Sequence, residues 1–320
     1  MHRLRVPLMV LILIAFALVP VYCWWVDSVY PLTLFGRILV FALAALGLNL
    51  ALGFGGMVSL GHAMYIGFGA YAVGIGSALG LESGALQILL AMLITALIAA
   101  PLGWIALRTQ GIAFIMITLA FAQLFYYVFI SLRMFGGDDG MTIQKLSAWG
   151  ALTGNKVAIY LSLVAALVLA IWGISRTVQS RFGLVLRATM VSERRVNAVG
   201  TPSLPYRLAA YVISAELCAV AGYFLANLTS FVSPAYMAWT LSGELIVMAL
   251  LGGSATVFGP VVGALALLLL EEGLKAFTDR WALILGPIIV LIVVFLRQGI
   301  WGLLSDPSEK PPGGSGGAHG

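Results

Sequence analysis

Residues 33–71 read TLFGRILVFALAALGLNLAL followed by GFGGMVSLGHAMYIGFGAY. The first part is an apolar run long enough to cross a bilayer as one helix, which takes about 20 residues. Gly53, Gly55, Gly56 and Gly61 then interrupt the apolar pattern before a second such run develops. Two apolar segments separated by a glycine cluster predict two membrane-spanning helices with a break in the helical backbone between them.

The composition extends this prediction to the whole chain. Of 320 residues, 62% are hydrophobic and 9% are charged, whereas soluble domains are about 25% charged. Ten apolar runs are present, at 6–26, 33–52, 57–79, 85–107, 111–131, 156–175, 206–231, 238–252, 257–272 and 281–297. We expect an all-α integral membrane domain over residues 1–304 with about ten transmembrane helices. The two short runs within 238–272 are compatible with two crossings or with one re-entrant pair.

The arginines give the predicted topology. The loop 176–205 contains the largest basic cluster, formed by Arg176, Arg181, Arg187, Arg194 and Arg195. Cytoplasmic loops of membrane proteins carry an excess of Lys and Arg, so we place this loop in the cytoplasm. Ten crossings then put the N- and C-termini in the cytoplasm, the loop 132–155 on the opposite, periplasmic side, and a disordered Pro- and Gly-rich tail, 305–320, in the cytoplasm. Because the basic residues lie between apolar runs, lipid and not nucleic acid is the expected partner.

Motifs for catalysis are absent from the sequence. It contains no G-x-x-x-x-G-K-[ST] phosphate loop and no H-E-x-x-H, C-x-x-C or G-x-S-x-G pattern. Its two cysteines, Cys23 and Cys218, lie in apolar runs without metal-ligand spacing, so we expect no metal site. We therefore expect a transport subunit and not an enzyme. Few ionisable residues lie inside the apolar runs, which favours a partner ATPase over a stand-alone ion-coupled carrier.

Polar side chains within the apolar runs are the candidates for a translocation path. They are Asn49, Ser59, His62, Tyr65, Gln123, Glu216, Asn227 and Glu244. Inside a membrane each such group must face protein or water, so they either stabilise helix packing or line the path. The predicted helix breaks are at Gly53, Gly55, Gly56, Gly61, Gly252, Gly253 and Gly259.

The basic loop contains a predicted short amphipathic helix. Its candidate coupling residues are Arg187, Glu193, Arg194, Arg195 and Gly200. The arginines form either a solvated face or a surface that docks on an acidic cytoplasmic partner. Gly200 is expected to end the helix, and the prolines at 202 and 205 prevent its continuation.

Four blocks of sequence resemble one known family. Residues 47–63, 180–200, 206–222 and 242–264 are similar, in this order, to membrane subunits of branched-chain amino-acid ABC importers. The resemblance covers residues 38–300, nearly the whole chain.

The resemblance implies a type II ABC importer-like permease fold in a bacterial plasma (inner) membrane. It implies a second homologous permease subunit, two cytoplasmic ABC ATPases that bind the ATP, so that this chain itself needs no cofactor, and a periplasmic or extracellular substrate-binding protein. It also implies that residues 193–200 contact the ATPase. The expected solutes are branched-chain or related small amino acids and amides, moved by alternating access. A urea or short-chain amide importer of the same family, and a stand-alone ion-coupled transporter, remain alternatives.

Overall fold

A computed structural model describes residues 2–81, 83–143, 147–148, 155–295 and 299–302 of the chain. The long helices are α1 (His2–Val26), α2 (Tyr30–Asn49), α3 (His62–Ala78), α4 (Gly84–Ala106), α5 (Ile112–Ser131), α6 (Lys156–Gln179), α9 (Ser203–Thr229), α10 (Trp239–Gly252), α11 (Gly259–Phe277) and α12 (Trp281–Phe295). Short helices are α7 (Arg181–Val191), α8 (Glu193–Ala198) and α13 (Gly299–Gly302), and two short strands are β1 (Met141–Thr142) and β2 (Phe231–Val232).

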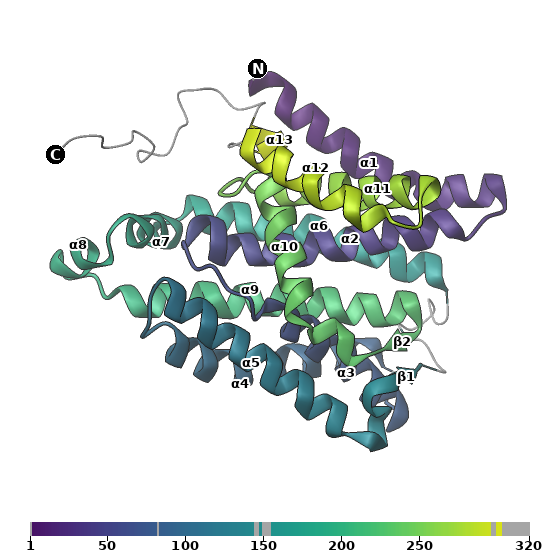
Figure 1. Cartoon of the computed structure of the whole chain (residues 1–320), viewed down its shortest axis with the longest axis horizontal. Coiled ribbons are helices and arrows are strands. Elements are labelled where there is room, and N and C mark those ends of the chain that lie inside the picture. Colours follow the sequence, from purple (N-terminus) through teal and green to yellow (C-terminus); the bar gives the residue numbers. More distant parts are fainter. Residues whose placement is uncertain (1, 82, 144–146, 149–154, 296–298, 303–320) are drawn as a thin grey trace.

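The helices form a layered bundle around α2, α6 and α9, which run side by side through its middle (Figure 1). Helices α3, α4 and α5 cover one side of this layer, and α1, α11 and α12 cover the other. Helix α10 lies across the bundle and connects the two sides. Of these central helices α2 and α9 are mostly buried by their neighbours, whereas α6 keeps one exposed face.

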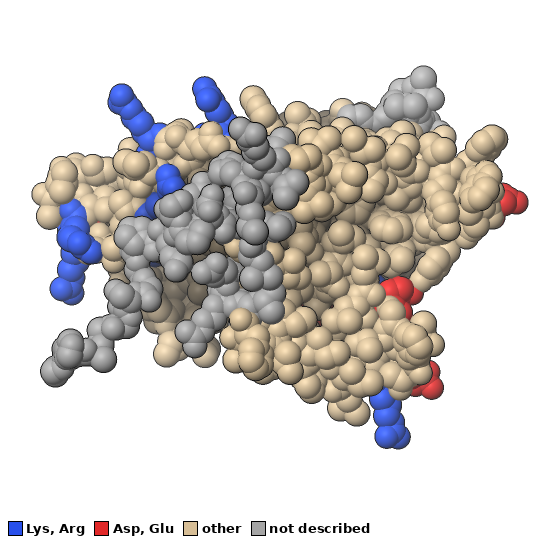
Figure 2. Space-filling view, turned by 90° about the horizontal axis from the view of Figure 1, so that it is seen from above, with Lys and Arg blue, Asp and Glu red and all other residues tan. Residues whose placement is uncertain are grey.

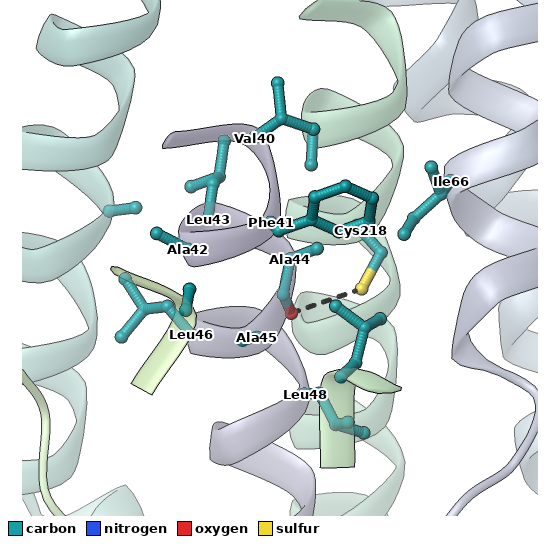
Figure 3. Packing of buried hydrophobic residues seen from close by; sticks show 14 of the residues in the cluster. Val40, Phe41, Ala42, Leu43, Ala44, Ala45, Leu46, Leu48, Ile66 and Cys218 are labelled. Carbon is teal, nitrogen blue, oxygen red and sulfur yellow. Dashed lines mark hydrogen bonds between the residues drawn. The ribbon is translucent and has the colours of Figure 1, made fainter. Parts of the chain in front are cut away.

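Small side chains permit the close packing at the centre. Of the most apolar window of α2 and its continuation, 83% is buried, against 11% for α1. Gly47 faces α9 so closely that a Cβ atom there would lie 2.8 Å from the Cβ of Leu217. Nearby, the buried thiol of Cys218 donates to the carbonyl oxygen of Ala44 at 3.6 Å (Figure 3). Cys218 is thus a small core side chain, as predicted.

Among the described residues, six segments are long and apolar enough to cross a membrane. They are Pro7–Val26, Tyr30–Phe54, Gly84–Ala106, Ile112–Ser131, Lys156–Gln179 and Ser203–Thr229. The other four predicted spans correspond to α3, α10, α11 and α12, which are shorter or, in α11, carry the charges of Glu271, Glu272 and Lys275. All ten apolar runs are thus helical over most of their length, while the number of crossings and the type II arrangement stay predictions.

The predicted break between the second and third apolar runs is confirmed, but its extent was underestimated. Helix α2 continues through a π-helical turn, Leu50–Phe54, and ends at Gly55. Gly56 has a φ of +66°, a left-handed conformation that favours glycine. Helix α3 begins at His62 and not at residue 57, where the sequence analysis started it. Gly61 packs against α5, since a Cβ atom there would lie 2.8 Å from the Thr118 carbonyl oxygen.

The predicted loop 132–155 contains glycine-rich turns and a strand. Gly136, Gly137 and Gly140 all have positive φ angles, which are typical of glycine in turns. The chain then forms β1, which pairs antiparallel with β2. This two-stranded ribbon is an exception to the all-α prediction. Residues 144–146 and 149–154 of the loop, and the predicted tail 305–320, lie outside the described residues.

The basic loop forms two helices where the sequence predicted one. Ser192, with φ −161°, separates α7 from α8 and caps α8, because its hydroxyl accepts a hydrogen bond from the Arg195 amide. Gly200 has a φ of +86° and ends α8. The Gly200 amide donates to the carbonyl of Asn197 and the next amide donates to that of Val196, which is a Schellman motif. The predicted role of Gly200 as the helix end is confirmed.

Most of the basic side chains seen in Figure 2 lie toward one end of the bundle, while the acidic ones lie toward the other, where a basic side chain also stands. We call the end that contains α7 and α8 the arginine end; its basic residues include Arg181, Arg187, Arg194, Arg195 and Arg207. The opposite, acidic end contains Asp27, Asp138, Asp139 and Glu272. The long helices run between these ends, as expected for a bundle whose ends lie in water.

Candidate functional site

The broken backbone before α3 is held by side chains from other helices. The Ala63 amide donates to the Ser242 hydroxyl of α10 at 2.9 Å. The Leu60 amide donates to the Thr118 hydroxyl of α5 at 3.2 Å. Both hydroxyl groups belong to fully buried residues. Each satisfies a backbone N–H group that has no partner in a helix, so the break is a defined structure shared by α3, α5 and α10.

A buried polar cluster lies between the first turn of α3 and α9. His62 Nε2 is 2.8 Å from the Ser214 hydroxyl of α9, and the Tyr65 hydroxyl donates to that of Tyr211 at 3.1 Å. We call Ser59, His62, Tyr65, Tyr211 and Ser214 the His62 cluster; all are 0% exposed. Of the predicted path residues, the structure brings together Ser59, His62 and Tyr65. The cluster is closed to solvent in this conformation.

Aromatic rings extend from the cluster in both directions along α3, α5 and α9. Toward the arginine end, the ring centroids of Tyr211 and Phe114 are 6.4 Å apart. Toward the acidic end, Tyr65 contacts Phe68 at 5.9 Å, and Phe68 contacts Phe125 at 4.9 Å. This column fills the space between α3, α5 and α9, so a solute can pass here only if these helices move apart.

The other predicted path residues lie elsewhere. The Asn49 carboxamide contacts the backbone at Ala255 and Thr256. The buried Asn227 amide group accepts from the Ser147 amide near the acidic end. Three further candidates are in separate places: Gln123 and Glu216 are half-buried, and Glu244 is exposed on α10. Among the described residues, the two carboxyl oxygens of Glu216 have no hydrogen-bond partner. These five residues do not join the His62 cluster.

The predicted glycine breaks of the second block pack two helices together. A Cβ atom at Gly252 would lie 1.8 Å from the Gly259 carbonyl oxygen, and one at Gly263 would lie 1.9 Å from the Met248 carbonyl oxygen. Gly253 has a φ of +118°. Helices α10 and α11 therefore approach each other so closely that only glycine fits at these positions.

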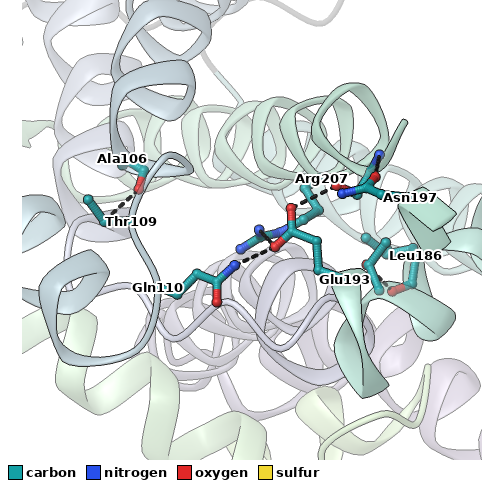
Figure 4. Close-up of polar contacts among 9 residues, drawn as sticks. Ala106, Thr109, Gln110, Leu186, Glu193, Asn197 and Arg207 are labelled. Atoms are coloured by element: carbon teal, nitrogen blue, oxygen red, sulfur yellow. Dashed lines mark hydrogen bonds and ion pairs between the residues drawn. The ribbon is translucent and has the colours of Figure 1, made fainter. Parts of the chain in front are cut away.

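At the arginine end, the predicted coupling residues face in different directions. Arg194 and Arg195 are exposed, and the Arg187 side chain folds back on its own helix, where Nε donates to the Gly183 carbonyl at 3.3 Å. Glu193 points inward: its carboxylate accepts from Gln110 at 2.6 Å and from Arg207 at 2.7 Å (Figure 4). The Arg207 side chain is 11% exposed, so this is a largely buried ion pair.

Two hollows lie beside this contact. A cavity of about 710 Å³ is lined by residues from 55–58, 110–115 and 189–197 together with Arg207. On the surface, an apolar groove of about 430 Å³ runs between α7 and α8 and is rimmed by Arg195. Leu184 and Val199 line the groove and are 65% and 84% exposed. Exposed apolar side chains that line a groove are typical of a surface that binds a partner, a ligand or a membrane.

Sequence reasoning missed several residues of both sites. They are Gln110, Thr118, Ser203, Arg207, Tyr211, Ser214 and Ser242, which the structure places in the contacts described above and below. A serine, a threonine or a tyrosine inside an apolar run gives no signal of its own. The sequence does show that Ser203 and Arg207 follow the coupling segment closely. Their contact with Glu193, however, depends on the turn that the chain makes at Gly200.

Six helices of spanning length, polar groups enclosed within the bundle and charges at its two ends define a multi-pass membrane protein. The chain belongs to the family described as "Branched-chain amino acid transport system / permease component", whose model matches residues 30–295. It is therefore a component of a transporter, as the resemblance predicted.

Two curated relatives are similar over most of their length. The "High-affinity branched-chain amino acid transport system permease protein LivM" of Salmonella typhimurium is 25% identical over 290 residues, which cover 82% of this chain and 68% of the relative. The protein of the same name from Escherichia coli is 26% identical over 292 residues, with the same coverage. No solved structure matches this chain.

Proposed function

We propose that this chain is a permease subunit of an ATP-driven importer for branched-chain amino acids. The observation that carries the proposal is the groove between α7 and α8, which is apolar, exposed and rimmed by arginine. A permease without nucleotide-binding motifs needs a surface on which a motor subunit can act. The names of the two LivM relatives support branched-chain amino acids as the solute class.

The arginine end faces the cytoplasm in this proposal, because positively charged loops are retained there. Arg194 and Arg195 are free to pair with acidic residues of an ATPase, while Leu184 and Val199 supply apolar contact area in the groove. A second homologous permease and an external binding protein complete the importer. The binding protein delivers the solute at the acidic end.

The solute leaves through the cavity at the arginine end. Its volume of about 710 Å³ is large enough for one amino acid, since the smallest pockets that bind small ligands have volumes of about 300 Å³. Glycine residues 55 and 56 bring the backbone of the break to its wall. The closed His62 cluster lies beyond Phe114, a lining residue whose ring contacts Tyr211. In this conformation the cavity is thus open toward the cytoplasm, and the His62 cluster closes the path toward the acidic end.

Co-purification of the ATPase subunits from membranes tests the proposal. We expect the full-length chain to retain them, and the double substitution Arg194→Glu with Arg195→Glu to release them, because both arginines are exposed on the docking face. Arg176→Glu, on the same end but on α6, is the matched control. Retention of the ATPases by the double variant, or no retention by the original chain, would refute the docking role.

A further inference from the structure

Glu193 is the first residue of α8, and its carboxylate is held by three donors. Oε1 accepts from the Ser203 hydroxyl at 2.7 Å, and Oε2 accepts from Gln110 Nε2 at 2.6 Å and from Arg207 Nη1 at 2.7 Å. Hydrogen bonds to a charged group at these lengths are the strong ones. The Glu193 side chain is 24% exposed, while the neighbouring Arg194 is fully on the surface.

These donors come from two different parts of the bundle. Ser203 and Arg207 belong to the first turns of α9, a helix of the central layer. Gln110 belongs to the turn between α4 and α5 (Figure 4). Glu193 is therefore the point at which the α7–α8 segment is joined both to the core and to the start of α5.

Helix α5 packs on the bundle along one face. Phe114, Thr118 and Ala122 are buried, and their spacing of four forms a buried stripe on that face. Further aromatic and aliphatic side chains of the helix, among them Phe125, are partly buried against the core. Gly111, directly before the helix, has a φ of +60° and open space where a Cβ atom would lie. A glycine at this position can serve as a hinge, so α5 can tilt if the aromatic contacts along its face rearrange.

The buried stripe of α5 contacts the elements that close the path. The Thr118 hydroxyl accepts from the Leu60 amide in the break before α3, and the Phe114 ring contacts Tyr211 of the His62 cluster. A displacement of Gln110 would therefore be transmitted through α5 to the backbone break before α3 and to the aromatic column.

We propose that Glu193 is a positioning residue that transmits movement of α7 and α8 to α5 through Gln110 and to α9 through Arg207. It is not a contact to the ATPase, although the resemblance assigns its segment to that contact. The exposed arginines dock the motor, and the inward carboxylate conveys the displacement to the helices around the cavity. This inference rests on the proposed function for the origin of the movement. The joint, by which we mean the contacts of Glu193 with Gln110 and Arg207, is a property of this chain alone.

Hydrogen exchange of the full-length chain in detergent tests the joint without any partner. Glu193→Gln keeps the shape but removes the charge, and we expect the amides of α8 and of the first turn of α5 to exchange about tenfold faster, since a charged hydrogen bond is lost. Arg194→Gln, at the exposed neighbouring position, is the control and leaves both segments unchanged. Faster exchange in α8 alone would show that Gln110 is not coupled, and would overturn the proposal.

Uptake by the assembled importer separates positioning from docking. With leucine as the probe, we expect Glu193→Gln to retain the ATPases and to lower ATP-dependent uptake about tenfold. The exchanged pair Glu193→Arg with Arg207→Glu restores part of the uptake that Glu193→Arg alone loses, because it re-forms the ion pair. Loss of the ATPases from Glu193→Gln, with unchanged exchange in α5, would make Glu193 a docking contact. If the original chain binds no ATPase, the proposed function fails, while the exchange result still decides on the joint.

Discussion

The side-chain amide of Asn49 donates a hydrogen bond to the backbone carbonyl of Thr256 at 2.8 Å, and its oxygen accepts one from the Ala255 amide at 3.3 Å. Asn49 ends α2 next to the first glycine break, and Thr256 lies between α10 and α11 next to the second. One side chain thus joins the two glycine-rich segments. Gly53 permits this approach, because a Cβ atom there would lie 2.4 Å from the Ala255 nitrogen.

This relationship predicts that Asn49→Ala destabilises the chain. The substitution removes both hydrogen bonds, which are part-buried, and each contributes about 0.5–1.5 kcal/mol. Thermal unfolding of the purified chain in detergent measures the loss. Gln123→Ala, at a half-buried amide outside this contact, serves as the control. Equal midpoints for the Asn49 variant and the original chain would show that the contact contributes nothing.

Ala255 has a φ of +63°, although it is not glycine. This conformation costs a non-glycine residue about 1–2 kcal/mol, and the Ala255 side chain is exposed. We therefore expect Ala255→Gly to raise the unfolding midpoint, and Ala255→Val to lower it. A midpoint that falls with glycine would mean that the strain is not present in the protein.

The close packing of α3 on α9 gives a third prediction. A Cβ atom at Gly222 would lie 1.9 Å from the Ile66 carbonyl oxygen, so Gly222→Ala must separate the two helices. We expect loss of folded protein in a size-exclusion assay, with a cost of roughly 1–3 kcal/mol or more from overpacking. Gly173→Ala is the matched control, because Gly173 is also helical but has open space around it. Its effect is neutral or slightly stabilising.

The hydroxyl pair of Tyr65 and Tyr211 gives a fourth prediction. Both are fully buried, and their oxygens are 3.1 Å apart. Tyr65→Phe and Tyr211→Phe each lower stability, and the double variant is less destabilised than the sum, with a coupling of about 0.5–1.5 kcal/mol. A double-mutant cycle of unfolding free energies measures it. Strictly additive effects would show that the hydrogen bond between the two hydroxyl groups does not stabilise the closed cluster.

Gly200 supplies a prediction that is local to the coupling segment. Its φ of +86° disfavours alanine, while the space around it would accept a methyl group. Gly200→Ala therefore costs about 1 kcal/mol through backbone strain alone, and hydrogen exchange should rise in α8 while α9 stays protected. Uniformly faster exchange across the bundle would instead mean that Gly200 stabilises the whole fold.

Much of the helical structure could be predicted because lipid imposes a simple rule. A segment in a bilayer must satisfy its own backbone, so each long apolar run becomes a helix. The breaks at Gly55 and Gly253 could also be predicted, because clustered glycine favours conformations that end helices. The start of α3 at His62 could not, since it depends on hydroxyl groups of Thr118 and Ser242 that come from distant helices.

The candidate site was only partly predictable for the same reason. Ser59, His62 and Tyr65 follow one another closely on the chain, so their proximity needs no knowledge of the fold. Glu193 was predicted to lie on the docking surface because the family resemblance assigns residues 193–200 to the ATPase contact. Its inward direction depends on Gln110 and Arg207, which lie far from it or across a turn in the sequence, and only the packed bundle brings them together.

Uptake of radiolabelled leucine into proteoliposomes tests the central claim most directly. The vesicles would contain this chain, a second permease subunit and the two ATPases, with the binding protein outside. The account predicts uptake that requires ATP on the ATPase side and that stops with Arg194→Glu and Arg195→Glu. Uptake by this chain alone, driven by a pH or sodium gradient and indifferent to ATP, would contradict it.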